Sequence, residues 1–206
     1  MLGNKPIVVV DYGMGNLGSI VNMLRKVGTT AEVGRSLETI GRAAKLILPG
    51  VGSFDAGMRS IEERGFREVL DEKALAQKVP VLGICLGAQL MTSHSEEGRL
   101  AGLGWIPGRT KRFSDESGLK VPHMGWNRAV VWRENPLTDN LPAEPRYYFV
   151  HSYYIQAEDK RDVILKTTYG VEFDSGIRRG NIYGVQFHPE KSHRFGLALL
   201  ANFASI

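Results

Sequence analysis

The chain has 206 residues, of which 43% are hydrophobic and 23% charged, a balance that is ordinary for a soluble globular protein. Its 26 basic and 22 acidic residues leave a net charge of +4. Arg109, Lys111 and Arg112 cluster, but they lack the interleaved aromatic residues of a nucleic-acid platform, so we interpret them as a solvated face or part of a partner surface. No apolar run approaches the roughly 20 residues that cross a bilayer.

The number of cysteines bears on the cellular compartment in which the protein is expected, and the chain has only one, Cys85. One cysteine forms no internal disulfide, so a reducing cytoplasm is the expected location. Residues 1–6 lead directly into an apolar run, without the pattern of a secretory signal. We find no linker, repeat or low-complexity segment, and expect residues 1–206 to form a single domain.

The first ninety residues alternate between expected strands and expected helices. Strands are predicted at residues 6–10, 31–33, 45–48 and 79–82, where aliphatic and β-branched residues run together. Helices are predicted at residues 17–27, 54–61, 66–75 and 88–91, with Ser53 as the N-cap of the second. This alternation predicts a parallel sheet covered by helices on both faces.

The second half of the chain predicts an antiparallel addition. Short strand candidates lie at residues 105–106, 129–132, 147–150, 163–165 and 171–173, and turn-forming residues separate most of them. Residues 122–127, which contain a proline, a glycine and an asparagine, are expected to form a loop. Residues 181–187 are expected to return to the main sheet. Ser192 is expected to cap a last helix with Phe195, Leu199 and Phe203 on one stripe.

Cys85 lies in the segment GICLG (residues 83–87), between an expected strand and an expected helix. This is the layout of a nucleophile elbow, a sharp turn that lifts one side chain clear of the sheet. The helix N-terminus behind Cys85 favours the thiolate, which is the nucleophilic form. Taken alone, the segment also fits a cysteine that serves as a small core hydrophobe.

A thiolate nucleophile needs a base, and the base needs an orienting group. Of the five histidines, His188 is the best candidate, because Pro189 favours an extended conformation before it and Glu190 follows two residues later. Backbone donors for an oxyanion are expected from Leu86, which follows the nucleophile, and from Val51 or Gly52 at the end of a parallel strand. Taken alone, H-P-E fits a surface turn, and residues 49–52 fit an ordinary strand-to-helix turn.

Three segments, GICLGAQ (residues 83–89), PGVGSF (49–54) and QFHPE (186–190), resemble the class I, triad-type glutamine amidotransferases. Three further segments, VDYGMGNL (10–17), PHMGWN (122–127) and YFVHSY (148–153), resemble the glutaminase subunits of imidazole glycerol phosphate synthase in histidine biosynthesis. The match runs from about residue 7 to residue 204. The expected fold class is therefore α/β: a flavodoxin-like, mostly parallel sheet with helices on both faces and an antiparallel, strand-rich addition in the C-terminal half.

The resemblance implies a mechanism. Cys85 attacks the side-chain amide carbon of glutamine, His188 transfers the proton to the leaving ammonia, and Glu190 orients His188. The positions that hold the amino-acid part of glutamine in this family match Gln89, Glu97, His151, Ser152 and Tyr153. From the pattern alone, Glu97 also fits a solvated charge and Tyr153 a strand core.

The resemblance also implies a partner. In this family the glutaminase docks on a (β/α)8-barrel cyclase subunit, which receives the ammonia and makes imidazole glycerol phosphate and an aminoimidazole carboxamide ribonucleotide. Asn16, Met124 and Trp126 match positions near that interface, although Met124 and Trp126 also fit core residues. No cofactor, metal, nucleic acid or membrane is implied.

Two alternatives stay open at this point. One is a different cysteine hydrolase or peptidase that uses the same elbow, against which Glu190 and the segment PHMGWN argue. The other is a non-catalytic binding module that kept the fold, against which the intact set of Cys85, His188 and Glu190 argues.

Overall fold

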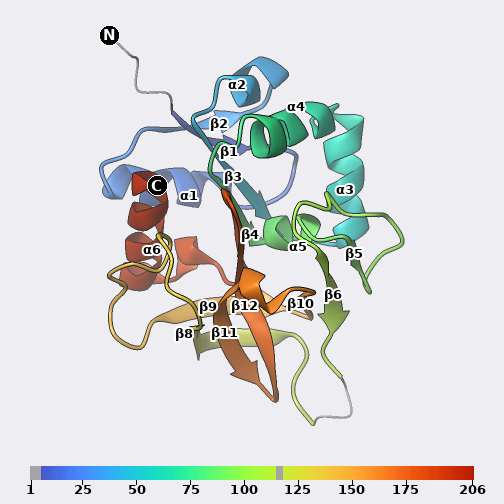
Figure 1. Cartoon of the computed structure of the whole chain (residues 1–206), viewed down its shortest axis with the longest axis vertical. Coiled ribbons are helices and arrows are strands. Elements are labelled where there is room, and N and C mark those ends of the chain that lie inside the picture. The colour runs from blue at the N-terminus through green and yellow to red at the C-terminus, as the bar shows by residue number, and fades with distance from the viewer. Residues whose placement is uncertain (1–5, 115–117) are drawn as a thin grey trace.

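The protein is described from a computed structural model, in which the described residues are 6–114 and 118–206. Its main feature is a sheet with the strand order β2-β1-β3-β4-β13-β12-β11-β8 (Figure 1). The first five strands in this order are parallel: β2 (Ala31–Gly34), β1 (Ile7–Val10), β3 (Lys45–Gly50), β4 (Val81–Cys85) and β13 (Ile182–Val185). This is the order of a flavodoxin-like doubly wound sheet, so the expected fold class is confirmed.

The remaining strands form the antiparallel addition. Three of them extend the main sheet: β12 (Val171–Arg179), β11 (Val163–Tyr169) and β8 (Val130–Val131). A smaller sheet contains β10 (Tyr153–Ala157), β6 (Gly108–Arg112) and β5 (His94–Ser95), and a two-stranded sheet pairs β7 (His123–Arg128) with β9 (Arg146–His151). Most of these strands lie together at one end of the molecule, below the parallel sheet in Figure 1, whereas β5 lies beside α3 and α5.

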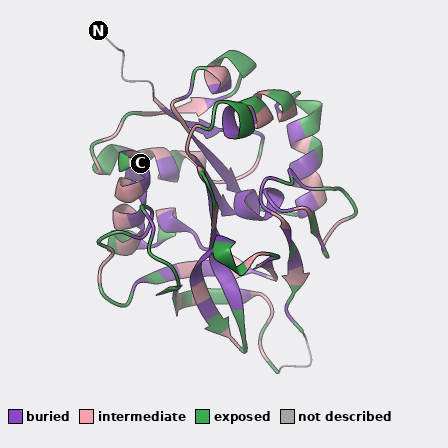
Figure 2. Cartoon of the chain, viewed as in Figure 1, coloured by how far each residue is buried: buried purple, intermediate pink, exposed green. Residues whose placement is uncertain are grey.

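Helices cover the two faces of the parallel sheet because its strands are apolar on both sides (Figure 2). Val8 and Val10 of β1 pack with one set of helices, and Ile7 and Val9 pack with the other. The first set contains α2 (Leu37–Gly41), α3 (Phe54–Glu63), α4 (Arg67–Asp71), the π-helix Glu72–Ala76 and α5 (Leu86–Leu90). The second set contains α1 (Leu17–Lys26) and α6 (His193–Ser205). Short 3-10 helices lie at Lys160–Asp162 and Pro189–Lys191.

Among the described residues, no helix combines the length and apolar character that crossing a membrane requires.

The strand predicted at residues 105–106 is wrong. Trp105 and Ile106 form a bend that is buried against the helical layer. The Trp105 indole N–H donates to Asp71 Oδ1 at 2.6 Å, and the Ile106 backbone N–H donates to the Met91 carbonyl at 3.1 Å. Both apolar side chains are therefore buried without strand pairing.

Both predicted serines occupy the N-cap position of their helix, but neither makes a capping hydrogen bond with its side chain. Ser53 occupies the N-cap position of α3 without a side-chain bond to it, and Glu97 Oε2 accepts from the Phe54 N–H at 2.8 Å instead. The Ser192 hydroxyl donates to the His188 carbonyl at 2.6 Å and accepts from the Tyr148 N–H at 3.0 Å. At both helix starts these polar groups link separate elements of the fold.

The loop predicted at residues 122–127 is also wrong, because most of this segment is strand β7. It pairs with β9 in antiparallel register, with His123 opposite His151. His123 is buried, whereas Met124 and Trp126 point outward and are 62% and 48% exposed. Gly125 supplies the positive φ, +134°, that the strand needs between them.

Candidate active site

Cys85 ends β4 and precedes α5 with φ 52° and ψ −111°, a backbone conformation that is costly for any residue with a side chain. The two neighbouring glycines make this turn sterically possible. A Cβ on Gly83 would lie 2.7 Å from the Ala88 backbone, and one on Gly87 would lie 1.7 Å from the Leu48 carbonyl oxygen. The strained turn is the elbow that the sequence predicts.

His188 reaches the same place from the neighbouring strand. β13 runs parallel to β4, and Val185 lies opposite Ile84 near the ends of both strands. The His188 N–H donates to the Tyr148 carbonyl at 2.9 Å, which fixes the backbone just beyond β13.

Glu190 holds the imidazole of His188. The distance from His188 Nδ1 to Glu190 Oε1 is 2.8 Å, and both side chains are almost fully buried. The backbone after His188 is a 3-10 turn that begins at Pro189, rather than the extended segment that we expected, because proline favours the first position of a helix. The turn still brings the two side chains into contact.

Charge stabilises the protonated ring of His188. Burial alone would lower the pKa of His188, but the hydrogen bond to Glu190 and the charges of Cys85 and Glu190 outweigh it and raise this pKa to about 10. The environment therefore favours an imidazolium beside the nucleophile at neutral pH.

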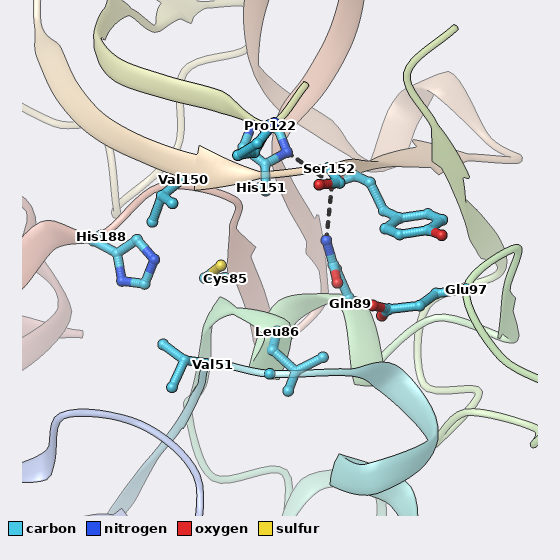
Figure 3. A pocket seen from close by; sticks show the side chains of 12 residues that line it. Val51, Cys85, Leu86, Gln89, Glu97, Pro122, Val150, His151, Ser152 and His188 are labelled. Carbon is cyan, nitrogen blue, oxygen red and sulfur yellow. Dashed lines mark hydrogen bonds between the residues drawn. The ribbon is translucent and has the colours of Figure 1, made fainter. Parts of the chain in front are cut away.

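A pocket of about 330 Å³ opens in front of Cys85 (Figure 3). Residues from both halves of the chain line it, since the ends of β3, β4 and β9 and the start of β10 meet there. Its lining residues are Val51, Gly52, Cys85, Leu86, Gln89, Glu97, Pro122, Val150, His151, Ser152, Tyr153 and His188.

The loop after β3 forms one wall of the pocket. A Cβ on Gly50 would lie 2.8 Å from both the Gly87 nitrogen and Leu86 Cβ, so only glycine allows this loop to pack against the elbow. The Tyr12 hydroxyl donates to the Pro49 carbonyl at 2.5 Å and anchors the same loop. Val51, next in the chain, is 45% exposed and faces the pocket.

Gln89 and Glu97 lie at the other end of the pocket. The Gln89 Nε2 donates both hydrogens, to the Tyr153 carbonyl at 2.9 Å and to Gln186 Oε1 at 3.1 Å. Its Oε1 is the atom left to accept from a ligand. The Glu97 carboxylate accepts a hydrogen bond from the Phe54 N–H at the start of α3, and it also lines the pocket. It is therefore not simply a solvated surface charge, the alternative that its sequence position also fits.

His151 lines the pocket, but both of its ring nitrogens have partners within the protein. Its Nδ1 lies 2.7 Å from the Tyr153 carbonyl, and its Nε2 lies 3.0 Å from His123 Nδ1. Burial lowers the pKa of His123 to about 4 and that of His151 to about 3, so both rings are neutral. The side chain of His151 therefore supports the pocket wall, and its ring nitrogens are not available to a substrate.

The three residues predicted at a partner interface lie outside the pocket lining. Asn16 caps α1, since its Oδ1 accepts from the Ser19 N–H at 3.2 Å. Trp126 stacks on His193 at a ring distance of 5.5 Å, and Met124 lies on the same outward face of β7. The core interpretation of Met124 and Trp126 is therefore wrong.

Several residues around the pocket were missed by sequence reasoning. Pro122 and Val150 line it, His123 supports His151, and Tyr12 supports the β3 loop. Gln186, which is fully buried, has its Nε2 3.8 Å from Cys85 Sγ. Its position two residues before the candidate base, His188, is the signal in the sequence that could have identified it.

Comparisons with known proteins give a consistent result. The family model described as Glutamine amidotransferase class-I matches residues 8–205. The chain is 52% identical to the imidazole glycerol phosphate synthase subunit HisH 2 of Methanococcus maripaludis, over 96% of this chain and 98% of that protein. It is 47% identical to the subunit of the same name in Pseudomonas aeruginosa, over 97% of this chain and 99% of that protein.

Solved structures share the fold at lower identity. A structure of PurLQS from Thermotoga maritima has a TM-score of 0.74 at 18% identity, covering 98% of both chains. A glutamine amidotransferase from Thermotoga maritima has a TM-score of 0.62 at 18% identity, covering 90% of this chain and 76% of that one.

Proposed function

Because this chain belongs to the class I glutamine amidotransferases, and among them to the HisH subunits of imidazole glycerol phosphate synthase, we propose that Cys85, His188 and Glu190 are its glutaminase triad. It is the subunit that hydrolyses glutamine for histidine biosynthesis, and we propose that residues 1–206 form a single domain. The observation that carries the triad assignment is the strained turn at Cys85 beside the buried pair of His188 and Glu190.

The first half of the reaction forms a thioester. The Cys85 thiolate attacks the side-chain amide carbon of glutamine, so a C–S bond forms and the carbonyl oxygen becomes an oxyanion. As the oxyanion collapses, the C–N bond breaks and the imidazolium of His188 gives its Nε2 proton to the leaving nitrogen. Ammonia departs, and Glu190 holds the ring through Nδ1 during this transfer.

The second half releases glutamate. A water molecule attacks the thioester carbon while His188 Nε2 accepts one of its protons. Collapse of the second oxyanion breaks the C–S bond and returns the thiolate and the imidazolium.

Backbone N–H groups of Leu86 and of Val51 or Gly52 are proposed to stabilise both oxyanions. Leu86 follows the nucleophile at the N-terminus of α5, and the other two lie on the loop that packs against the elbow. Each such donor lowers the barrier by about 3–4 kcal/mol.

The polar end of the pocket is proposed to hold the amino-acid part of glutamine. Gln89 Oε1 and the Glu97 carboxylate are acceptors suited to an α-ammonium group, and Ser152 and Tyr153 complete the wall. We assign His151 to this site as a supporting residue, since its ring nitrogens bind Tyr153 and His123.

We propose that a (β/α)8-barrel cyclase subunit docks where Met124 and Trp126 project from β7, with Asn16 nearby. The support is the name of the relatives, which are subunits of a synthase, and the exposure of two large apolar side chains on one strand face. The barrel would receive the ammonia and make imidazole glycerol phosphate and an aminoimidazole carboxamide ribonucleotide. The single cysteine and the biosynthetic relatives support a cytoplasmic location.

The test is a glutaminase assay with and without the cognate barrel subunit and its nucleotide ligand. We expect ammonia and glutamate in equal amounts, more of both with the complete synthase, and neither from the Cys85→Ala variant. That variant complex should still make product from added ammonia. Glutamine hydrolysis by Cys85→Ala, or peptide cleavage in place of glutaminase activity, would overturn the assignment.

A further inference from the structure

A buried chain of hydrogen bonds ends at the sulfur of the nucleophile. Gln186 Nε2 lies 3.8 Å from Cys85 Sγ, within the range of a hydrogen bond to sulfur. Gln186 is fully buried and comes from the segment that joins β13 to His188. Neither the triad nor the proposed oxyanion donors include it.

The orientation of the Gln186 amide follows from its neighbours. The Tyr153 carbonyl is an acceptor only, so the Gln89 atom 2.9 Å away from it must be the amide nitrogen. That nitrogen lies 3.1 Å from Gln186, where it needs an acceptor, so the Gln186 oxygen faces Gln89. The Gln186 NH₂ group must then face Cys85. Reversing either amide would set two donors or two acceptors against each other.

The same carbonyl is anchored from the other side. His151 Nδ1 must donate to Tyr153, which makes His151 Nε2 an acceptor and His123 Nδ1 a donor. His123 Nε2 then accepts from Asn127 Nδ2 at 3.2 Å. Both lone pairs of the Tyr153 carbonyl are therefore engaged, since His151 donates to it from one side and Gln89 from the other. Gln89 also donates to Gln186, which in turn donates to the sulfur.

We propose that Gln186 is a further residue of the nucleophile's site, a donor that holds the Cys85 sulfur and stabilises its thiolate form. A thiolate accepts stronger hydrogen bonds than a thiol, because charge-assisted bonds are roughly twice as strong as neutral ones. Gln89 is then a positioning residue as well as a pocket residue, since it fixes the Gln186 amide. The inference rests on the proposed function only in taking Cys85 as the nucleophile.

Other titratable groups also act on Cys85, and a test must separate them from Gln186. The charge of the His188 imidazolium acts on the sulfur. Tyr12 is buried and also interacts with Cys85. Its pKa is raised mainly by burial and, to a smaller extent, by the charge of Cys85. Neither group contacts Gln186 in the hydrogen bonds described, so a substitution at Gln186 leaves both in place.

The test is the rate of alkylation of Cys85 by iodoacetamide across pH, in the full chain. Gln186→Met keeps the side-chain length but removes the donor, and we expect alkylation at neutral pH to slow by about 10- to 100-fold. Gln186→Glu still accepts from Gln89 but turns a carboxylate oxygen to the sulfur, and should react more slowly still. Wild-type rates in either variant would overturn the proposal.

Ser175→Ala is the matched control. Ser175 is buried, accepts the Gln186 backbone N–H at 2.9 Å through its carbonyl, and binds Thr167 through its hydroxyl at 2.8 Å. Its loss removes a buried hydrogen bond beside Gln186 without touching Cys85, so alkylation should match the wild type even if the melting temperature falls.

One measurement needs no variant. The side-chain NH₂ resonance of Gln186 in ¹⁵N-labelled wild-type protein should shift as Cys85 titrates, and an unchanged resonance would overturn the proposal even if the variants fail to fold. With the barrel subunit present, Gln186→Met should lower kcat for glutamine. Should the chain prove not to hydrolyse glutamine, the alkylation and resonance results would still decide the role of Gln186 separately.

Discussion

Replacing Glu190 with glutamine separates the charge of the carboxylate from its role as an acceptor. In the wild type, Glu190 Oε1 lies 2.8 Å from His188 Nδ1, and both side chains are almost fully buried. The raised pKa of His188 keeps Nδ1 protonated at neutral pH, so an amide at position 190 would present its oxygen to the ring.

The expected magnitude follows from this geometry. A hydrogen bond to a charged group contributes about 1.5–3 kcal/mol and a neutral one about 1 kcal/mol, so the change costs about 0.5–2 kcal/mol, or roughly 2- to 30-fold in kcat. Within the described part of the chain, Glu190 Oε2 is buried without a partner. The new NH₂ group would take its place, and should lower the stability of the fold by about 1–3 kcal/mol.

The assay is steady-state glutaminase activity of Glu190→Gln and His188→Asn in complex with the barrel subunit, with thermal melts of both. His188→Asn removes the acid and base itself, so its turnover should fall by about 10²- to 10⁴-fold or more. If Glu190→Gln lowers turnover further than His188→Asn while both remain folded, the assigned roles are incorrect.

Four further outcomes are expected. Cys85→Gly should melt at a higher temperature than Cys85→Ala, by about 1 kcal/mol of stability, because glycine adopts the positive φ of the elbow more readily; equal melts would argue against strain there. Gly50→Ala should reduce glutaminase activity by displacing the β3 loop, whereas Gly18→Ala on α1, where a Cβ meets nothing within 4 Å, should not. Trp126→Ala should weaken binding of the barrel subunit by about 2 kcal/mol or more with little change in the melt, since Trp126 is 48% exposed; unchanged affinity in a titration would remove it from the interface. Finally, because His188 has a pKa of about 10 when folded and about 6.5 when unfolded, its contribution to stability is complete below pH 6.5 and is lost as pH rises toward 10; denaturant titrations in which His188→Asn shows the same alkaline loss as the wild type would contradict this.

The parallel half of the fold was predictable because its signals are local. Each element can be predicted from its own residues alone: β1, β3 and β4 from their apolar runs, and α1 from its amphipathic pattern. The segment at residues 122–127 shows where this fails. Its proline and glycine favour a loop, yet pairing with β9, which is distant in sequence, makes most of it a strand.

The candidate site, too, could be predicted from the sequence only in part. Cys85 and His188 stand in short motifs whose spacing reflects their chemistry, so the sequence suffices to propose them. The contact of Gln186 with Cys85 depends on an amide orientation set by the Tyr153 carbonyl, which lies on a different sheet. The ring of His151 and the cap provided by Glu97 likewise depend on partners that only the folded chain brings near.

The central claim is that glutamine hydrolysis passes through a thioester on Cys85. The most direct measurement is mass spectrometry of acid-quenched complex, made with the barrel subunit and its nucleotide ligand, during turnover of isotopically labelled glutamine. The account predicts a labelled glutamyl group on the peptide that contains Cys85, and more of it in Glu190→Gln if release of glutamate is slowed. Sustained turnover with no label on that peptide, or with label on another residue, would contradict it.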